Sequence, residues 1–491
     1  MAEPYSFRGD LRRHAYIWLV LVAGLLIWGW LDVRWRGVIE LDRPDRHRTD
    51  LTAYTEAAAA FFDGRDPYQV TNIRGWGYLY PPLFALLLTP LIGFDSQTQV
   101  WLFYLASLVV TLGCYIELRR LASALAGPSS NSPPAPNTVP QTTPADWLAL
   151  GLAVALPALN TLQRGQVGLL KLYPLLLGTR LILFPRKRTD IFWGGVALAF
   201  PVALKITPVL PVALLLGGLV LRALWKRADA TVRQTAIDSS LGVALGSLAW
   251  WLVIPALVLG WDANVNYLVT WHQKVIAKAE TVRADDLGGD VTSPRNQSLA
   301  NAGYRLGNWL AYRFQWGPDD RLVDTSDAAA GTMPMDAPWA ERGLWLARMA
   351  TLAWLGAAML LLSRRGQPLD LVLLLSLGCV GTLVVSPISR GHYFVMLAPA
   401  LLFIPAWLRG CGLRAAADVT PFLPATFSLA HYLGLEFTGR IGLLGVTTSL
   451  WLWAVLVRVM KQGSTPAVET ANVLTTLQPK IPEQATLRRA A

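Results

Sequence analysis

The amino-acid sequence predicts an all-α protein that crosses a membrane many times. Of its 491 residues, 53% are hydrophobic and only 15% are charged, and its mean hydropathy is +0.39. A soluble protein of this length needs more charged residues to cover its surface, so this composition excludes a soluble enzyme. The hydrophobic residues also gather in runs of roughly 17 to 25, which is the length of a membrane-spanning helix.

Twelve such runs are candidate spans, nine of them clear and three weaker. The clear ones are residues 15–31, 100–116, 167–184, 206–225, 241–261, 344–362, 369–385, 393–408 and 441–460. The weaker ones are residues 147–159, 191–204 and 419–435. We therefore expect about twelve membrane helices in one transmembrane domain, residues 15–461. The first run is too long for a cleaved signal peptide.

Basic residues predict the orientation of these spans. Arg8, Arg12 and Arg13 precede the first span, which places residues 1–14 in the cytoplasm. With twelve spans the short inner loops are rich in Arg and Lys, and the C-terminus is also cytoplasmic. The net charge of +11 is explained in this way, and no nucleic-acid partner is expected.

The segments between the spans differ in character. Residues 32–99 and 262–343 form two long outer loops, and the short apolar stretch 81–91 is predicted to be interfacial or re-entrant rather than spanning. Residues 127–144 have the composition of a flexible cytoplasmic linker, and residues 462–491 that of a disordered cytoplasmic tail. Cys114, Cys379 and Cys411 have no metal-like spacing, so we interpret them as packing residues.

Polar clusters gather on the predicted outer face, whereas the inner loops hold only basic runs. The outer clusters are residues 49–54 (TDLTAY), 78–82 (YLYPP), 164–168 (RGQVG), 204–208 (LKITP), 295–301 (RNQSLAN) and 386–393 (SPISRGHY). Several of them adjoin the ends of apolar spans, where an unpaired polar group is costly and points to function. Together they predict a polar pocket that opens outward at the membrane surface.

Several residues in these clusters allow two interpretations. Asp50 precedes apolar residues at helical spacing, so it is either a plain helix N-cap or a carboxylate that accepts a proton from a hydroxyl group. Lys205 either extends its ammonium group to the membrane–water interface or binds a phosphate as a point charge. His392 lies two residues from Arg390 and is either a structural histidine or a functional one. Tyr80 precedes a Pro-Pro pair that either starts a helix or marks an anion site.

The ordered set of motifs resembles glycosyltransferase family 87 over roughly residues 45–460. The matching motifs are D-x-x-x-Y at Asp50 and Tyr54, G-x-D-P-Y at 64–68, Y-P-P-L-F-A-L-L-L-T-P-L at 80–91, G-Q at 165–166, A-L-K-I-T-P at 203–208, N-Q-S-L at 296–299 and S-P-x-S-x-x-H-Y at 386–393. The family belongs to the membrane-embedded C superfamily of glycosyltransferases (GT-C). The resemblance therefore implies a GT-C fold, with interfacial helices in the first outer loop.

The resemblance also implies an activity and a place for it. Such enzymes transfer a sugar, typically mannose, from a polyprenyl-phosphate donor to a glycolipid or glycan acceptor on the extracytoplasmic face. We therefore expect an integral protein of a bacterial plasma membrane. Asp50 is implied as the general base and His392 as part of a loop important for activity. Some relatives use polyprenyl-phosphate arabinose, which leaves the sugar open.

The remaining site predictions follow from the chemistry of sugar transfer from a phosphate. Positive groups must stabilise the departing phosphate, and the candidates are Lys205, Arg390, Arg164 and Arg295. The predicted substrate-binding residues are Tyr54, Tyr80, Gln166, Asn296, Gln297 and Tyr393. One carboxylate without an obvious second nucleophile favours a single inverting displacement. Because no paired acidic motif is present, we expect neither a metal nor a cofactor.

Two other classes of protein compete with this reading. A twelve-span transporter or lipid flippase needs polar residues that open to both faces in turn, whereas the clusters here lie on one face. A non-catalytic scaffold in an envelope assembly is the other alternative.

Overall fold

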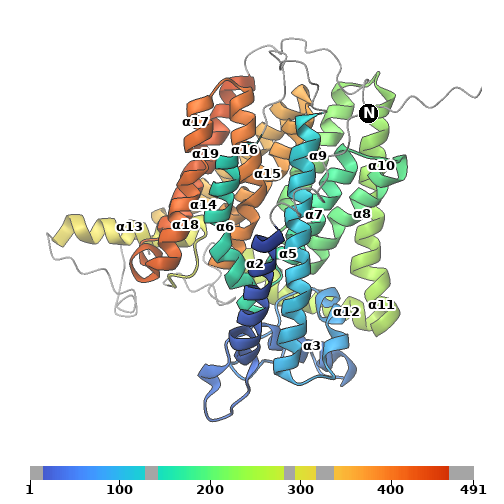
Figure 1. Cartoon of the computed structure of the whole chain (residues 1–491), viewed down its shortest axis with the longest axis vertical. Coiled ribbons are helices and arrows are strands. Elements are labelled where there is room, and N and C mark those ends of the chain that lie inside the picture. The colour runs from blue at the N-terminus through green and yellow to red at the C-terminus, as the bar shows by residue number, and fades with distance from the viewer. Residues whose placement is uncertain (1–14, 128–141, 281–292, 317–334, 336, 464–491) are drawn as a thin grey trace, which may run out of the picture.

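The computed structural model describes residues 15–127, 142–280, 293–316, 335 and 337–463, and these residues form a bundle of helices (Figure 1). The described residues contain no β-strand, only isolated bridges between Thr71 and Gly77 and between Asn296 and Arg390. The predicted all-α membrane fold is therefore confirmed.

Each of the twelve predicted spans contains a helix. These helices are α2 (Ala15–Trp28), α5 (Ser96–Ala126), α6 (Pro144–Arg164), α7 (Gly168–Leu183), α8 (Arg188–Leu204), α9 (Val209–Trp225), α10 (Ala230–Leu248), α14 (Pro338–Arg365), α15 (Pro368–Val385), α16 (Ala398–Gly410), α18 (Phe422–Leu433) and α19 (Leu443–Gly463). Among the described residues, seven helices are long and apolar enough to cross a membrane. α18 has only 12 residues and is about 18 Å long, so the number twelve stays a prediction.

The first outer segment folds against one end of the bundle. α3 (Leu51–Phe62) lies there near α12 (Trp261–Trp271), at the bottom of Figure 1. α4 (Pro82–Leu87) continues into a 3₁₀ turn, Thr89–Leu91, and the ten residues together span about 15 Å. A helix this short does not cross a bilayer, in agreement with the prediction for residues 81–91.

Three further helices complete the fold. α10 continues through a π-helical turn into α11 (Ile254–Leu259), and α17 (Arg414–Val419) precedes α18. α13 (Leu299–Trp316) extends sideways from the bundle, as the yellow helix in Figure 1 shows. The sequence analysis did not predict α13, because it lies within the long second outer loop.

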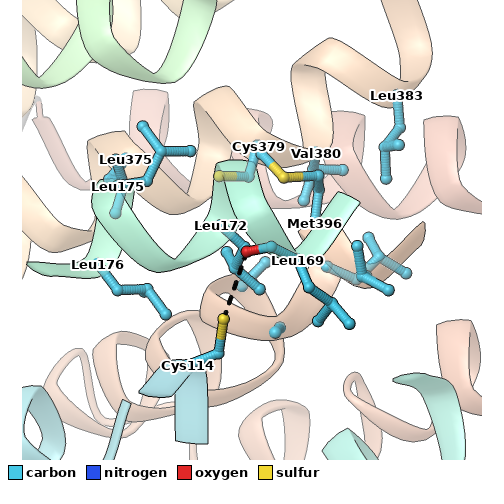
Figure 2. Close-up of a cluster of buried hydrophobic side chains, with 14 of the residues drawn as sticks. Cys114, Leu169, Leu172, Leu175, Leu176, Leu375, Cys379, Val380, Leu383 and Met396 are labelled. Atoms are coloured by element: carbon cyan, nitrogen blue, oxygen red, sulfur yellow. Dashed lines mark hydrogen bonds between the residues drawn. The ribbon is translucent and has the colours of Figure 1, made fainter. Parts of the chain in front are cut away.

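Helix α15 forms the centre of the bundle. All of its residues from Leu369 to Val384 are buried, whereas α2 and α10 expose many large apolar side chains toward the surrounding lipid. Figure 2 shows part of this core, where α15 packs on α7 and the Cys114 thiol of α5 donates to the Leu169 carbonyl at 3.6 Å. Cys114 and Cys379 are buried and unpaired, as expected for packing residues.

Two glycines allow α8 and α10 to pack backbone against backbone. A Cβ atom on Gly242 would lie 2.1 Å from the Phe192 carbonyl oxygen, and one on Gly195 would lie 2.3 Å from the Ser239 carbonyl oxygen. Small residues of this kind allow close helix packing in a membrane, where the hydrophobic effect does not drive helices together. α8 is thereby fixed, and Lys205 directly follows its C-terminal end.

Candidate functional site

A tight turn at the C-terminal end of α6 holds the start of α3. The Asp50 amide donates to the Arg164 carbonyl at 2.9 Å, and the Thr49 hydroxyl donates to the same oxygen at 3.2 Å. Gly165 ends α6 with a left-handed φ of 66°. A Cβ atom there would lie 2.8 Å from the Leu51 Cβ, so both its φ and the close contact favour glycine at this position. Segments far apart in the sequence therefore meet at one point.

The Asp50 side chain faces this turn instead of capping its own helix. Asp50 occupies the N-cap position of α3, yet its carboxylate makes no capping hydrogen bond. Arg164 donates to both oxygens, from Nη2 to Oδ1 at 2.8 Å and from Nε to Oδ2 at 3.0 Å, and Gln166 Nε2 donates to Oδ2. The carboxylate is 11% exposed. The plain N-cap interpretation is therefore not what the structure shows.

Hydrogen bonds continue from this carboxylate to a lysine. The Tyr80 hydroxyl donates to Gln166 Oε1 at 3.3 Å and lies 3.1 Å from the Tyr54 hydroxyl. Lys205 Nζ donates to the Tyr80 hydroxyl at 3.3 Å and to the Tyr393 hydroxyl at 2.5 Å. We call these six residues, Asp50, Tyr54, Tyr80, Gln166, Lys205 and Tyr393, the outer cluster. Three polar segments that the sequence analysis singled out thus meet at Lys205.

A second lysine, which the sequence analysis missed, adjoins the outer cluster. Lys171 is 2% exposed, and its Nζ donates to the Thr207 hydroxyl at 3.0 Å. Its Nζ lies 5.3 Å from the centre of the Tyr393 ring, and Lys205 Nζ lies 4.3 Å from the centre of the same ring. The sequence did contain an indication of this residue, because Lys171 is the one lysine inside the apolar run 167–184. A charged residue within a membrane span is costly and therefore indicates a functional site.

The two lysines have no acidic partner. Among the residues that the structure describes, no carboxylate forms an ion pair with Lys171 or Lys205. Lys205 instead lies over the Tyr80 ring at 4.6 Å, in addition to Tyr393. Lys205 lies between α8 and α9, where desolvation, together with the charge of Arg390, lowers its pKa to about 7. Because Arg164 already pairs with Asp50, the outer cluster and the neighbouring Lys171 and Arg390 together have surplus positive charge.

The loop before α16 carries His392 beside the outer cluster. The His392 ring is buried, lies edge-on to Tyr393 at 4.6 Å and has an Nε2 atom without a hydrogen-bond partner among the described residues. Its carbonyl accepts from the Thr161 hydroxyl of α6 at 3.1 Å. Arg390 is half-buried, and its charge acts on Lys205. His392 and Arg390 therefore lie with the predicted site.

The amide side chains of Asn296 and Gln297 fix the loops behind this site. Asn296 donates from Nδ2 to the Pro387 carbonyl at 3.2 Å and accepts from the Ser389 amide at 2.9 Å. Gln297 Nε2 donates to the Pro294 carbonyl at 2.7 Å. These contacts hold the loop that carries Arg390. Arg295 is exposed, and no contact of its side chain with the outer cluster is observed among the described residues.

Comparison with known proteins identifies the family. The model of glycosyltransferase family 87 matches residues 78–387, which are 310 of the 491 residues. The chain belongs to glycosyltransferase family 87. It is accordingly a glycosyltransferase, and its apolar helices make it an integral membrane protein.

A characterised relative covers nearly the whole chain. This protein is 25% identical over 516 aligned positions, which include 98% of each chain. It is the polyprenol-phosphate-mannose-dependent alpha-(1-2)-phosphatidylinositol mannoside mannosyltransferase of Mycolicibacterium smegmatis. No solved structure matches the chain. The family match begins after Asp50, so the case for that carboxylate comes from its geometry.

Proposed function

We propose that this family 87 glycosyltransferase moves mannose from a polyprenyl-phosphate donor to a hydroxyl group of a glycolipid acceptor. The observation that carries the proposal is the outer cluster, which joins the Asp50 carboxylate to the unpaired Lys205 cation at one end of the bundle. Sugar transfer from a phosphate needs a base for the acceptor and a cation for the leaving group. The donor and acceptor classes in this proposal are those of the mycobacterial relative, as its name gives them.

Asp50 acts as the general base in this mechanism. A carboxylate offers about four acceptor positions, and Arg164 and Gln166 occupy three of them. Oδ1 has one bond and Oδ2 has two, so Oδ1 keeps a position for the acceptor hydroxyl. The acceptor oxygen attacks the anomeric carbon as its proton passes to Asp50. The arrangement supports an inverting displacement, because the outer cluster contains one carboxylate.

The cations bind the phosphate. Lys205 and Arg390 stabilise the charge that develops on the phosphate oxygen as the bond to the sugar breaks. His392 offers its unpartnered Nε2 to the donor. Arg164 differs from the other predicted phosphate ligands, because its guanidinium already holds Asp50. In this proposal Arg164 orients the base and leaves phosphate binding to Lys205 and Arg390.

The proposal is tested by a transfer assay on the purified protein in detergent. Radiolabelled polyprenyl-phosphate mannose is incubated with a phosphatidylinositol mannoside, and movement of label to the acceptor is measured. Polyprenyl-phosphate arabinose serves as the competing donor. Transfer of arabinose but not mannose would show that arabinose is the donor sugar and would leave the proposed mechanism unchanged. Failure to transfer any polyprenyl-phosphate sugar would overturn the proposal. Metal independence stays a prediction, which assay in EDTA checks.

We infer that the outer cluster faces the extracytoplasmic side, because the basic loops lie at the other end of the chain's spans. A cysteine replacing Asp63 on α3 is expected to react with a membrane-impermeant maleimide in intact cells. A cysteine replacing Arg188, at the start of α8, is expected to react only after permeabilisation. Both side chains are exposed, at 56% and 71%. The native Cys114 and Cys379 are buried, and the partly exposed Cys411 is replaced with Ser in both proteins. The reverse labelling pattern would invert the orientation.

The donor KM is expected to rise with pH. Lys205 has a pKa of about 7 in the free enzyme, so it is charged below pH 7 and loses its charge above it. Because the anionic donor binds the charged form, KM should increase toward tenfold per pH unit above about pH 7. Steady-state kinetics from about pH 6 to 9 measure this slope. Lys205→Arg should flatten it, since guanidinium stays charged; an equal slope in both proteins would contradict the assignment.

A further inference from the structure

We propose that Lys171 and Lys205 together form a cradle for a phosphate dianion, so that the site binds the departing polyprenyl phosphate more tightly than the intact donor. This inference rests on the proposed function and adds Lys171 to Lys205 and Arg390 as a phosphate-binding residue. The cradle consists of the two lysines, Thr207 and the Tyr393 ring, whose centre lies 5.3 Å from Lys171 Nζ and 4.3 Å from Lys205 Nζ.

The reaction changes the charge of the phosphate. The donor is a phosphodiester with one negative charge. The bond between the anomeric carbon and the phosphate oxygen breaks, and its electron pair stays on that oxygen. The acceptor oxygen forms the new bond to the anomeric carbon, and its proton passes to Asp50. The leaving group is then a phosphate monoester, which has a charge of about −1.5 to −2 at pH 7, so the extra negative charge arises during the chemical step.

The structure supplies two cations for this change. Lys205 is bound by two tyrosine hydroxyls and lies over two aromatic rings, and Lys171 is bound by the Thr207 hydroxyl and lies near the Tyr393 ring. Aromatic rings and hydroxyl groups stabilise an ammonium without neutralising its charge. A carboxylate would have cancelled it. Both ammonium groups therefore retain their positive charge and can bind the phosphate of the substrate.

The burial of Lys171 strengthens the argument. A lysine in the apolar interior is costly unless an anion or a hydrogen-bonding partner compensates it. Lys171 is 2% exposed, and among the described residues its ammonium makes one hydrogen bond, to the Thr207 hydroxyl, and one contact with an aromatic ring. Thr207 lies in the same turn as Lys205, so both lysines are attached to one rigid element. A phosphate bound to Lys205 therefore approaches Lys171 as well.

The cradle predicts a particular kinetic effect. An interaction that is stronger in the transition state than in the bound donor raises kcat and has little effect on KM. Lys205 and Arg390 are sufficient for the monoanionic donor, and Lys171 gains its anionic partner only as the bond breaks. Lys171 should therefore act on kcat and on inhibition by the product, polyprenyl phosphate.

The first experiment needs no variant. Inhibition of the wild-type enzyme is compared for polyprenyl phosphate and for its methyl diester, which has the same chain and one negative charge. We expect the dianion to inhibit at least about tenfold more strongly. Equal inhibition by the two compounds would overturn the cradle. Binding of both compounds, measured directly by titration calorimetry, gives the same comparison if the enzyme transfers no sugar, so failure of the proposed function remains distinguishable.

The second experiment assigns the effect to Lys171. Lys171→Met is expected to lower kcat and weaken polyprenyl phosphate binding about 10- to 100-fold, while the donor KM changes less than about threefold. Lys171→Arg should recover part of both, since it restores the charge. Leu172→Met, a neighbouring buried position on α7, controls for packing. Equal loss of donor and product binding in Lys171→Met would assign Lys171 a merely structural role, and no change in either would remove it from the site.

Discussion

Replacing Asp50 with Asn is expected to lower kcat about 10²- to 10⁴-fold, while the protein still inserts and binds its donor. The amide keeps an oxygen that accepts from Arg164, so the turn at Gly165 should hold its shape. It cannot take the acceptor proton, which removes the base from the reaction. The measurement is single-turnover transfer of labelled mannose, together with donor binding by titration.

The matched control is Asp63→Asn, at the other end of the same helix. Asp63 is exposed and pairs with Arg65 on the surface, so its loss should leave kcat within about twofold. Turnover of Asp50→Asn near the wild-type rate would contradict the role of Asp50 as base. Loss of donor binding along with turnover would instead show that Asp50 holds the site together.

Replacing Lys205 with Ala is expected to weaken donor use about 10- to 150-fold in kcat/KM, with little change in the acceptor KM. The lysine donates to Tyr80 and Tyr393, and hydrogen bonds through Tyr80 and Gln166 join it to Asp50. Its removal deletes a charge that faces the phosphate, whereas the acceptor meets Asp50. Separate titration of the two substrates measures the effect on each.

Lys274→Ala provides the comparison for Lys205→Ala. Lys274 also lies on the outer side, but it pairs with Asp66 at 3.4 Å and is partly exposed. Its removal should have only a small effect on donor use. Equal effects of Lys205→Ala on donor and acceptor, or an effect no larger than that of Lys274→Ala, would argue against Lys205 as the phosphate ligand.

The sequence predicted the helices better than the contacts between them. Every apolar run contains a helix, because hydropathy determines which segments a bilayer accepts. The short stretch 81–91 contains a helix of only ten residues, and its interfacial or re-entrant place stays a prediction. Helix α13 was missed, because an amphipathic helix in a long outer loop produces no run of apolar residues. Its buried polar residues, such as Arg305, contact loop carbonyls that only the folded chain brings near.

The residues of the site were predicted more easily than their partners. Asp50 and Arg164 are 114 residues apart, so their pairing depends on a turn that no local pattern encodes. The sequence also did not reveal that the amides of Asn296 and Gln297 bind backbone carbonyls. An amide side chain near a site can bind either the backbone or a substrate, and the sequence does not distinguish the two. Lys171 was overlooked because one charge hardly changes the hydropathy of an apolar run.

The buried helix α15 at the centre of the bundle bears on whether sugar transfer is coupled to proton movement across the membrane. α15 is buried along its length. Its Ser376 hydroxyl donates to a carbonyl of the same helix, and its Thr382 hydroxyl donates to the Gly378 carbonyl of the same helix and to the Thr207 carbonyl. Along α15, the described residues form no continuous chain of hydrogen-bonding groups by which a proton could travel between the two aqueous compartments. The proton that Asp50 takes from the acceptor must leave through the face where it entered. Turnover should therefore neither use nor dissipate the membrane potential, and the free energy of transfer comes from the donor bond alone.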